Sequence, residues 1–392
     1  MKILFLTFYY EPDLCAGSFR NTSLLKELVK HLKQEDTIDV VTTHPNRYDS
    51  FKMEAKDKEK VRDGIFVNRI KIPEHGSGIL GQIKSFKKFY FEALELTKNK
   101  EYDLVYASSS RLFTAFLGAR IVRKKKAKLY LDIRDIFRET ITDLYKSKVL
   151  NLGLNLILKP IENYTFGRAE HINLVSKGFE SYFTKYTKAK YTFFTNGIDE
   201  LFLSLKKKDT FSRNDKKTIV YGGNIGEGQG LDLIIPQIAM KLSDTHRFLI
   251  IGDGGAKNKL EDQLKINKIN NVDLLPPVTR DRLIDYYQNA DFLFLHLNKH
   301  KAFERVLPSK LFEYGTFDKP IIAGVDGYAK VFLKENMSNL ILFEPTNSDE
   351  LYEKIKKYSY VNIDRLDFKE KFSRLEINKK MANSIIALGD EQ

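Results

Sequence analysis

Residues 218–242 read TIVYGGNIGEGQGLDLIIPQIAMKL, and this stretch decides the fold class. Residues 218–221 form a short run of β-branched and aromatic side chains, which predicts a buried strand. Five glycines follow within residues 222–230, and the apolar spacing of residues 231–242 predicts a helix. A strand, a glycine-rich loop and a helix in this order are typical of a parallel α/β sheet, with the loop at the carboxyl end of the strand.

The glycine-rich loop is a candidate phosphate or diphosphate site. Glycines let the backbone approach a ligand closely, and the N-terminus of the next helix offers unpaired N–H groups to an anion. The loop contains neither the G-x-G-x-x-G dinucleotide spacing nor the Gly-Lys-Ser/Thr of a P-loop. A merely tight strand-to-helix turn is the alternative. The candidate donor-binding residues here are Gly223, Asn224, Gly226 and Gln229.

The same alternation of apolar runs and helical patterns extends along the chain. Strands are expected at residues 3–8, 38–43, 65–70, 104–107, 128–132, 170–175, 191–194, 247–251, 272–275, 292–295 and 320–323. Helices are expected at residues 23–33, 113–122, 280–288, 309–316 and 349–358. The polar run 196–217 separates the two series. The fold class is therefore α/β, with two Rossmann-like, doubly wound domains.

Charge is distributed unevenly. The chain of 392 residues has a net charge of +13, and residues 1–200, with 35 Lys and Arg against 25 Asp and Glu, account for +10 of it. The excess is dense at Lys84, Lys87 and Lys88 and around residues 120–128. A solvated face is the plain explanation, while an anionic membrane or a phosphorylated substrate would also account for it. No nucleic-acid-binding motif accompanies the basic residues, so nucleic acid is not expected as a partner.

Two further strand-to-helix loops resemble ligand-binding turns. Residues 12–20 read PDLCAGSFR, in which Gly17 and Ser18 offer backbone donors and Arg20 is expected to reach into an inter-domain cleft. Residues 251–254 read IGDG and contribute Gly252 and Asp253. A later turn, residues 324–329, adds Gly327 as another candidate for phosphate contact.

The segment Pro308-Ser309-Lys310-Leu311-Phe312-Glu313-Tyr314 predicts a helix start with Ser309 as its cap. Lys310 then lies in the first turn, an unfavourable place for a cation unless an anion shares the site. Glu313, one turn on, is placed to accept hydrogen bonds from a ribose diol. A capping-box glutamate is the alternative.

Known metal and nucleophile patterns are missing from the sequence. It contains no His-Glu-x-x-His, EF-hand or Asp-x-Asp, since Asp132 and Asp135 stand three positions apart. One cysteine, Cys15, excludes an internal disulfide and fits a reducing cytoplasm. The scattered histidines 171, 246, 296 and 300 are expected to be structural. Neither a metal nor a cofactor is expected.

These loops, in this order, resemble family 4 glycosyltransferases, retaining enzymes of the GT-B fold that use nucleotide sugars. The resemblance also rests on Ser176 in NLVSKG, on the run 196–199 (NGID) and on residues 289–291 (NAD). Within the family, the chain is similar to bacterial N-acetyl-L-fucosamine transferases of O-antigen and capsule synthesis. The resemblance implies two domains facing across a cleft. Residues 1–197 would bind the acceptor, residues 198–370 the sugar nucleotide, and residues 371–392 would form a helix packing back toward the first domain.

The resemblance also implies roles for individual residues. Glu313 would hold the donor ribose, Gly17, Gly223 and Gly226 would lie near the diphosphate, and Asp135 would lie on the acceptor side. Three positions depart from the family pattern. Arg305 stands near the place of the first of two paired glutamates, Gln229 replaces a common Lys or Arg, and Tyr328 replaces a glutamate. We therefore expect Arg305 or Lys310 to contact the diphosphate and count both, with Glu313 and Asp135, as catalytic candidates.

The expected activity is transfer of a sugar from a UDP-sugar to a polyprenyl-pyrophosphate-linked saccharide, without a metal. A sugar-nucleotide epimerase or hydrolase and a non-catalytic sugar-nucleotide or polyanion binder are the alternatives. Residues 145–162 place polar side chains at three- and four-residue steps, leaving an apolar face of Leu150, Leu154, Ile157, Leu158 and Ile161. This face predicts a peripheral position on the inner, anionic side of the cell membrane, with Lys124, Lys125 and Lys126 assisting. A buried core or dimer helix is the alternative.

Overall fold

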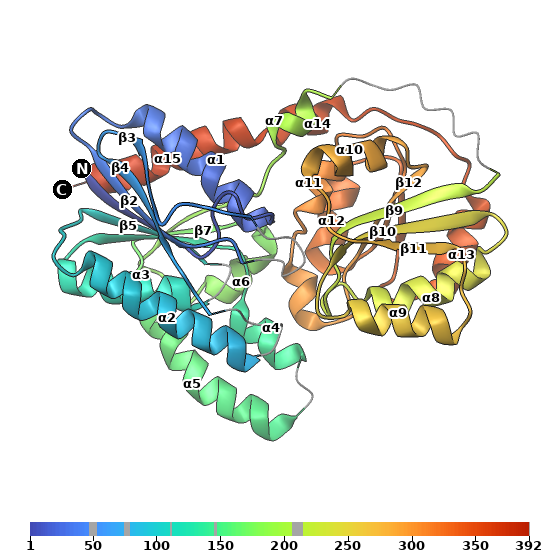
Figure 1. The fold of residues 1–392 in the computed structure, drawn as a ribbon, viewed down its shortest axis with the longest axis horizontal. Coiled ribbons are helices and arrows are strands. Elements are labelled where there is room, and N and C mark those ends of the chain that lie inside the picture. The colour runs from blue at the N-terminus through green and yellow to red at the C-terminus, as the bar shows by residue number, and fades with distance from the viewer. Residues whose placement is uncertain (47–52, 74–78, 110–111, 145–146, 206–214, 392) are drawn as a thin grey trace. The chain divides into compact units, whose positions relative to one another are not determined.

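The computed structural model describes residues 1–46, 53–73, 79–109, 112–144, 147–205 and 215–391. The chain divides into two compact units (Figure 1). The N-terminal unit comprises Met1–Asn196 and Arg374–Gln392, and the C-terminal unit comprises Gly197–Ser373. The sequence placed these divisions after residues 197 and 370.

The N-terminal unit alternates strands and helices. Its elements are β1 (Lys2–Thr7), α1 (Ala16–His31), β2 (Thr37–Thr43), β3 (Lys58–Arg62), β4 (Ile65–Ile70), α2 (Ile79–Thr97), β5 (Leu104–Ser109), α3 (Leu112–Lys125), β6 (Lys128–Ile133), α4 (Phe137–Leu144), α5 (Lys148–Phe166), β7 (His171–Leu174), a 3-10 turn (Lys177–Phe179), α6 (Glu180–Phe183), β8 (Lys190–Thr192) and the C-terminal α15 (Arg374–Asp390). The strands form one sheet in the order β3-β4-β2-β1-β5-β6-β7-β8, in which only the β3–β4 pair is antiparallel.

Helices cover both faces of this sheet (Figure 1). On one face α1 and α15 pack on the central strands, where Leu24, Leu28, Met381 and Ile385 are buried. On the other face lie α2, α3 and α5, joined by ring contacts of Phe116 in α3 with its neighbours on either side. Burial on both faces explains the near-continuous apolar runs from which the strands were predicted.

Helices α2, α4 and α6 were not predicted, and two further elements of this unit differ from the prediction. Helix α1 begins at Ala16, whereas the sequence predicted a start at residue 23. The prediction was too short because buried polar residues such as Asn21 and Thr22 interrupt the apolar pattern in the first half of the helix. Gly17 and Ser18 therefore lie in the first turn of the helix and not in a loop. Strand β3 was missed because its sequence, KEKVR, contains one apolar residue and is exposed at the sheet edge.

The N-terminal half of helix α5 turns two asparagines inward and most of its apolar side chains outward. Asn151 donates to the carbonyl of Thr142 at 2.8 Å. Arg138 of α4 donates to Asn155 at 2.8 Å and to the buried carboxylate of Glu162 at 2.7 Å. The outward side chains, 45–84% exposed, are Val149, Leu150, Leu152, Leu156 and Ile157.

The predicted helix 145–162 is therefore α5, although residues 145 and 146 lie outside the described residues. The expectation that Leu158 lies on the outer face is wrong, because its side chain is 4% exposed. The alternative of a fully buried core helix is also wrong, since five large apolar residues of its N-terminal half face solvent.

The C-terminal unit follows the same plan. Its elements are α7 (Glu200–Leu203), β9 (Lys217–Asn224), α8 (Leu231–Lys241), β10 (His246–Asp253), α9 (Lys257–Ile266), β11 (Val272–Leu275), α10 (Arg280–Gln288), β12 (Phe292–His296), a 3-10 turn (Lys301–Arg305), α11 (Lys310–Tyr314), β13 (Ile321–Gly324), α12 (Gly327–Asn336), β14 (Leu340–Phe343), α13 (Ser348–Lys357) and α14 (Leu366–Lys371). Its six strands are parallel, in the order β11-β10-β9-β12-β13-β14.

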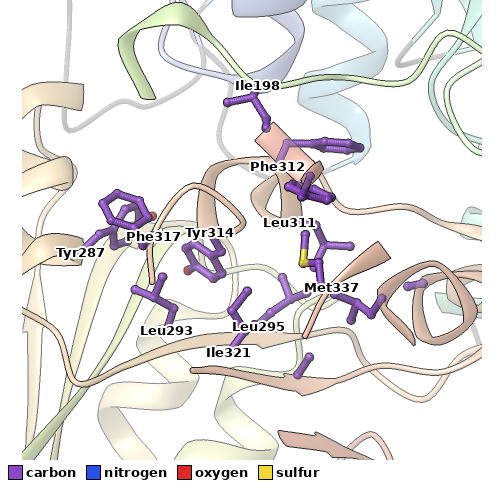
Figure 2. Packing of buried hydrophobic residues seen from close by; sticks show 14 of the residues in the cluster. Ile198, Tyr287, Leu293, Leu295, Leu311, Phe312, Tyr314, Phe317, Ile321 and Met337 are labelled. Carbon is purple, nitrogen blue, oxygen red and sulfur yellow. The ribbon is translucent and has the colours of Figure 1, made fainter. Parts of the chain in front are cut away.

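Two apolar clusters sandwich this sheet. One packs α8, α9 and α13 against it, and the other packs α10, α11 and α12 against the opposite face (Figures 1 and 2). In the second cluster Leu311, Phe312 and Tyr314 of α11 are almost fully buried beside Leu293 and Ile321. Helix α11 is thus fixed to the core by three side chains in five residues.

The strand orders locate the expected ligand edge in each unit. The chain order reverses between β1 and β5 in the N-terminal sheet and between β9 and β12 in the C-terminal sheet. Ligands of open α/β sheets bind beyond the carboxyl ends of the strands at such reversals. The two doubly wound sheets predicted from the sequence are confirmed.

Candidate active site

In the C-terminal unit, Lys310 lies directly against the glycine-rich loop. A Cβ built on Gly223 would stand 1.9 Å from Lys310 Nζ. The φ of Gly223 is +141°, a conformation that residues with a side chain rarely adopt. Glycine at this position therefore leaves room for the ammonium group beside the end of β9.

The environment of Lys310 differs from the one expected. Helix α11 has only five residues, and Ser309 makes no side-chain capping hydrogen bond. A helix this short has only a small dipole, so the dipole does not make the position of Lys310 unfavourable. Instead, Nζ lies 5.0 Å from the centre of the Tyr221 ring, a cation–π distance. Ring and glycine together hold the cation at the carboxyl edge of the sheet.

Gly252 brings the second loop close to the first. It pairs with Gly223 in the parallel register of β10 and β9. A Cβ on Gly252 would stand 1.8 Å from the Gly223 carbonyl oxygen, so only glycine fits. Asp253, the next residue, is half-buried and its carbonyl accepts the backbone N–H of Ile225 at 2.8 Å. The two predicted loops are thus one continuous backbone surface.

Gln229 organises the glycine-rich loop from within. Its Oε1 accepts from Asn224 Nδ2 at 2.7 Å and from the backbone N–H of Gly226 at 3.2 Å. Gln229 thus bonds to the loop itself, at the position where the resemblance implied a cation. These contacts explain why a neutral side chain is useful there.

His296, at the end of β12, fixes the same loop from the neighbouring strand. The Thr346 N–H donates to Nε2 at 2.9 Å, so Nδ1 carries the proton and donates to the Gln229 carbonyl at 2.6 Å. Burial lowers the pKa of His296 to about 4, and the ring is neutral at pH 7. His296 is therefore structural, as expected from the sequence.

Two buried tyrosines hold the end of β9. The Tyr287 hydroxyl donates to the Gly222 carbonyl at 3.3 Å, and the Tyr314 hydroxyl donates to the Phe294 carbonyl at 3.1 Å. Burial raises the pKa of both hydroxyls, so they remain protonated donors. Neither tyrosine was singled out from the sequence, because each becomes relevant only through contacts with a distant strand.

The remaining candidates of this unit lie around the same edge. Glu313 is half-buried one turn after Lys310. Arg305 is half-buried at the end of the 3-10 turn. Gly327 has φ +57° and would place a Cβ 2.1 Å from the Glu304 carbonyl oxygen. Packing against that turn is sufficient to explain glycine at 327, and its contact with a phosphate stays a prediction.

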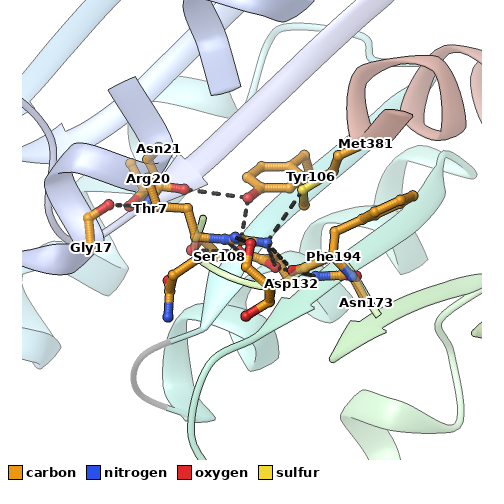
Figure 3. Close-up of polar contacts among 12 residues, drawn as sticks. Thr7, Gly17, Arg20, Asn21, Tyr106, Ser108, Asp132, Asn173, Phe194 and Met381 are labelled. Carbon is orange, nitrogen blue, oxygen red and sulfur yellow. Dashed lines mark hydrogen bonds and ion pairs between the residues drawn. The ribbon is translucent and has the colours of Figure 1, made fainter. Parts of the chain in front are cut away.

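In the N-terminal unit, the expectation that Arg20 reaches a ligand is wrong. Arg20 is 0% exposed, and Nε and Nη2 each donate to Asp132 at 2.8 Å (Figure 3). Its remaining donors bind the carbonyls of Phe194 and Thr195. Burial alone would raise the pKa of Asp132, but the Arg20 guanidinium outweighs it and holds that pKa below its usual range. Arg20 is a structural residue because the buried carboxylate requires its charge.

The predicted neighbours of Arg20 lie at the start of α1. Gly17 accepts from Asn21 Nδ2 through its carbonyl at 2.8 Å. Ser18 is 1% exposed, and its hydroxyl has no hydrogen-bond partner among the described residues. A Cβ on Gly17 would stand 2.4 Å from Nη1 of Arg134, a residue that the sequence did not single out.

Asp135 follows β6 at the carboxyl edge of the N-terminal sheet. Its side chain is half-buried and accepts from Thr140 Oγ1 at 3.0 Å. Burial raises the pKa of Asp135 to about 6. A carboxyl group with a raised pKa at a ligand edge is a frequent property of functional sites.

Within the described residues, no group of three or more His, Cys, Asp or Glu side chains is arranged to hold a metal ion. Among the described helices, none has the length and apolar character required to cross a membrane.

Comparison with known proteins agrees with this geometry. Residues 204–374 match the family model of glycosyl transferases group 1. The C-terminal unit carries a glycosyl transferases group 1 domain. Over 98 residues, the chain is also 36% identical to the putative colanic acid biosynthesis glycosyl transferase WcaI of Escherichia coli (strain K12). That match covers 25% of this chain and 24% of the relative, so the chain matches about a quarter of the relative's length.

Solved structures extend the likeness to the whole fold. Anabaena Alr3699/HepE in complex with UDP is 16% identical with a TM-score of 0.65, covering 99% of this chain and 100% of the other. The apo lipopolysaccharide outer core galactosyltransferase WaaB is 13% identical with a TM-score of 0.58, covering 99% of both chains. At these identities the likeness shows the fold alone, and that fold is GT-B. The group 1 domain is thus the second half of a GT-B chain.

Proposed function

We propose that the protein is a retaining glycosyltransferase that moves a sugar from a UDP-sugar to a polyprenyl-pyrophosphate-linked saccharide. The observation that carries the proposal is the position of Lys310 Nζ over Gly223, inside a group 1 glycosyltransferase domain. Charge develops on the leaving diphosphate in this reaction, and fixed cations and backbone donors stabilise it. Lys310 and the glycine-rich loop supply both kinds of group at one edge of the sheet.

The bond changes require no nucleophile from the enzyme. The bond between the anomeric carbon and the diphosphate oxygen breaks, and the electron pair leaves with UDP. An acceptor hydroxyl forms the new bond on the same face of the sugar and passes its proton to the departing diphosphate. In this scheme Lys310 and Arg305 balance the diphosphate charge, Glu313 accepts the ribose hydroxyls, and Asp135 contacts the acceptor.

The choice of UDP is supported by the Anabaena structure of the same fold, which is a complex with UDP. The choice of a surface polysaccharide is supported by the colanic acid glycosyl transferase and by the lipopolysaccharide galactosyltransferase among the similar proteins. The resemblance to N-acetyl-L-fucosamine transferases adds that sugar as the first donor to test. The proposal requires neither a metal nor a cofactor.

The test combines candidate UDP-sugars with a polyprenyl-pyrophosphate saccharide and measures UDP release and product mass. We expect Lys310→Gln and Glu313→Gln to lower kcat/KM by about 100-fold each, since each removes a charged contact to the donor. Lys334→Gln, which removes an exposed lysine of α12, is the matched control.

Three other outcomes would contradict the proposal. Consumption of the UDP-sugar at the same rate without acceptor would identify an epimerase or hydrolase. Tight binding without turnover for any pair would identify a binding protein. Full activity of both Lys310→Gln and Glu313→Gln would show that the reaction occurs elsewhere in the chain.

We further propose that the enzyme works in the cytoplasm at the inner, anionic face of the cell membrane, docked through α5 and α2. The outward residues of α5 form an apolar strip, held in place because its polar residues bind α4. On α2, Ile83 and Phe91 are exposed beside Lys84, Lys87 and Lys88. Apolar side chains beside lysines suit the interface of an anionic bilayer better than a protein partner.

The basic residues 124–126 are less suited to this surface than the sequence suggested. They precede β6, at the amino edge of the sheet, whereas α4 and the exposed half of α5 follow the carboxyl end of β6. The basic residues 124–126 and the start of α5 therefore lie at opposite edges of the sheet. Lysines 84, 87 and 88 lie in the first half of α2, which follows the carboxyl end of β4.

Sedimentation with vesicles containing phosphatidylglycerol tests the surface. Replacing Leu152, Leu156 and Ile157 by serine, or Lys84 and Lys87 by glutamate, should lower the bound fraction by about tenfold. Glutamates at 124–126 should have a smaller effect. Dimer loss in the serine variant with unchanged sedimentation would instead assign the strip to a second copy of the chain.

A further inference from the structure

Arg134 is an unassigned cation at the carboxyl edge of the N-terminal sheet. It follows β6, and its backbone N–H donates to the Ser109 carbonyl at 3.1 Å. Its Nη1 lies 2.4 Å from the position that a Cβ of Gly17 would take. The guanidinium thus occupies the space that only glycine leaves open at the first turn of α1.

The charge of Arg134 is poorly balanced by its surroundings. Nε is buried and has no hydrogen-bond partner among the described residues. The Asp132 carboxylate interacts electrostatically with Arg134 but already accepts hydrogen bonds from Arg20, Asn173, Tyr106 and Ser108. Burial, with the nearby Arg20 charge adding to it, lowers the pKa of Arg134 despite Asp132. A buried donor without a partner is costly, so a site that keeps one has a use for it.

The first turn of α1 adds donors at the same place. The helix has 16 residues, and its N-cap, Cys15, makes no side-chain capping hydrogen bond. The Phe19 N–H donates to the Cys15 carbonyl at 3.1 Å. Residues 16–19 include no acidic side chain that would accept from the N–H groups of residues 16–18. In this turn the buried Ser18 hydroxyl also lacks a partner among the described residues. An arginine fork, a hydroxyl and free backbone amides are the groups that bind phosphate.

We infer that Arg134 and the first turn of α1 bind a phosphate group of a ligand. Arg134 thereby makes the ligand contact that the sequence predicted for Arg20, whose guanidinium is instead paired with Asp132. Binding of a phosphate does not depend on the proposed function, whereas the identity of its carrier does. The carrier is the diphosphate of the nucleotide sugar or the pyrophosphate of the acceptor, and the two are separated by experiment.

Titration calorimetry of the full chain with inorganic pyrophosphate is the first experiment. Arg134→Gln should weaken binding by about 10- to 100-fold, and Arg134→Lys by less, because it keeps the charge but loses the fork. Lys310→Gln is the background for all the calorimetric measurements, so that the C-terminal unit does not mask the effect; the kinetic measurements use chains that retain Lys310. Arg123→Gln, which removes an exposed arginine of α3, is the control.

Gly17→Ala guards against a folding defect in the arginine variants. Its methyl group would displace Nη1 while leaving Arg134 in the sequence, so it should also weaken pyrophosphate binding. Unfolding midpoints of all variants are measured in parallel. Unchanged affinity in both Arg134→Gln and Gly17→Ala, or no pyrophosphate binding by the Lys310→Gln protein, would overturn the inference.

Kinetics then identify the carrier. A rise in the KM for the UDP-sugar alone assigns the phosphate to the donor, and a rise for the acceptor alone assigns it to the acceptor. If no pair of donor and acceptor reacts but Arg134→Gln still weakens pyrophosphate binding, the proposed function is wrong and the phosphate site at Arg134 is supported. If transfer occurs and Arg134→Gln alters neither KM nor pyrophosphate affinity, the site fails alone.

Discussion

Both units place a side-chain cation over a glycine at the carboxyl edge of a parallel sheet, but they fix the surrounding backbone differently. In the C-terminal unit Lys310 lies over Gly223, and the loop is held by uncharged groups, chiefly His296 and Gln229. In the N-terminal unit Arg134 lies over Gly17, and the neighbouring scaffold is an ion pair between Arg20 and Asp132 with 0% exposure of either side chain.

The difference shows that one chemical task permits two kinds of support. Neutral hydrogen bonds hold the glycine-rich loop without adding a second charge beside the cation. A buried ion pair is stable only while both partners are present and charged. The two units should therefore respond differently to loss of a partner and to acid.

Asp132→Asn should cause the largest loss of stability. The amide is similar in size but leaves the Arg20 guanidinium buried without its counter-charge, so we expect the free energy of unfolding to fall by about 3–5 kcal/mol. Urea unfolding measures it. Glu376→Gln removes one partner of an exposed pair with Lys379 in α15 and should cost less than about 1 kcal/mol. Equal effects for the two variants would contradict the role given to burial.

His296 should make the C-terminal unit sensitive to acid. Its pKa is about 4 in the folded chain and about 6.5 when unfolded, so the folded state binds fewer protons between these values. Stability is therefore lost as the pH falls from 6.5 to 4, by up to about 3 kcal/mol. His296→Asn removes this titration, so its deficit relative to wild type should shrink over that range. A constant deficit would contradict the assignment of a neutral ring.

Asp135→Asn should stabilise the N-terminal unit at neutral pH. The pKa of about 6 means that the folded state binds more protons than the unfolded state between pH 3.8 and 6, so stability falls as the pH rises through this window. The variant avoids that loss and should gain about 1–2 kcal/mol at pH 7.5 and nothing at pH 3.5. Loss of transfer activity alongside this gain would mark Asp135 as a functional residue.

The smallest effects on stability should come from the two glycines. Gly17→Ala lies in a helix and meets only the end of a flexible arginine, so the free energy of unfolding should change by less than about 1 kcal/mol. Gly223→Ala also meets the end of a side chain, Lys310, but at φ +141° it should cost about 1–3 kcal/mol. Gly153→Ala, in α5 with nothing within 4 Å of its Cβ, is the control without a steric contact and should gain about 0.5–1 kcal/mol from helix propensity. Similar losses at 17 and 223 would contradict the backbone argument.

Local pattern predicted most of the elements correctly. The apolar runs identified the strands of both sheets except β3 and β14, and residues 280–288 were predicted with the bounds that α10 has. Buried parallel strands are continuous apolar segments, so they are visible without any tertiary contact. Edge strand β3 and the first half of α1 lack that signal, which is why one was missed and the other shortened.

By itself, the sequence determined the α/β class, the two doubly wound sheets and the loops at their ligand edges, because glycine content and apolar periodicity are local properties. Only the tertiary structure decided which cation serves which loop. Arg20 stands close to Gly17 in the sequence and Arg134 stands far from it, yet the Asp132 carboxylate binds Arg20 and leaves Arg134 over Gly17. That choice depends on burial and on partners from distant strands, and no spacing along the chain encodes it.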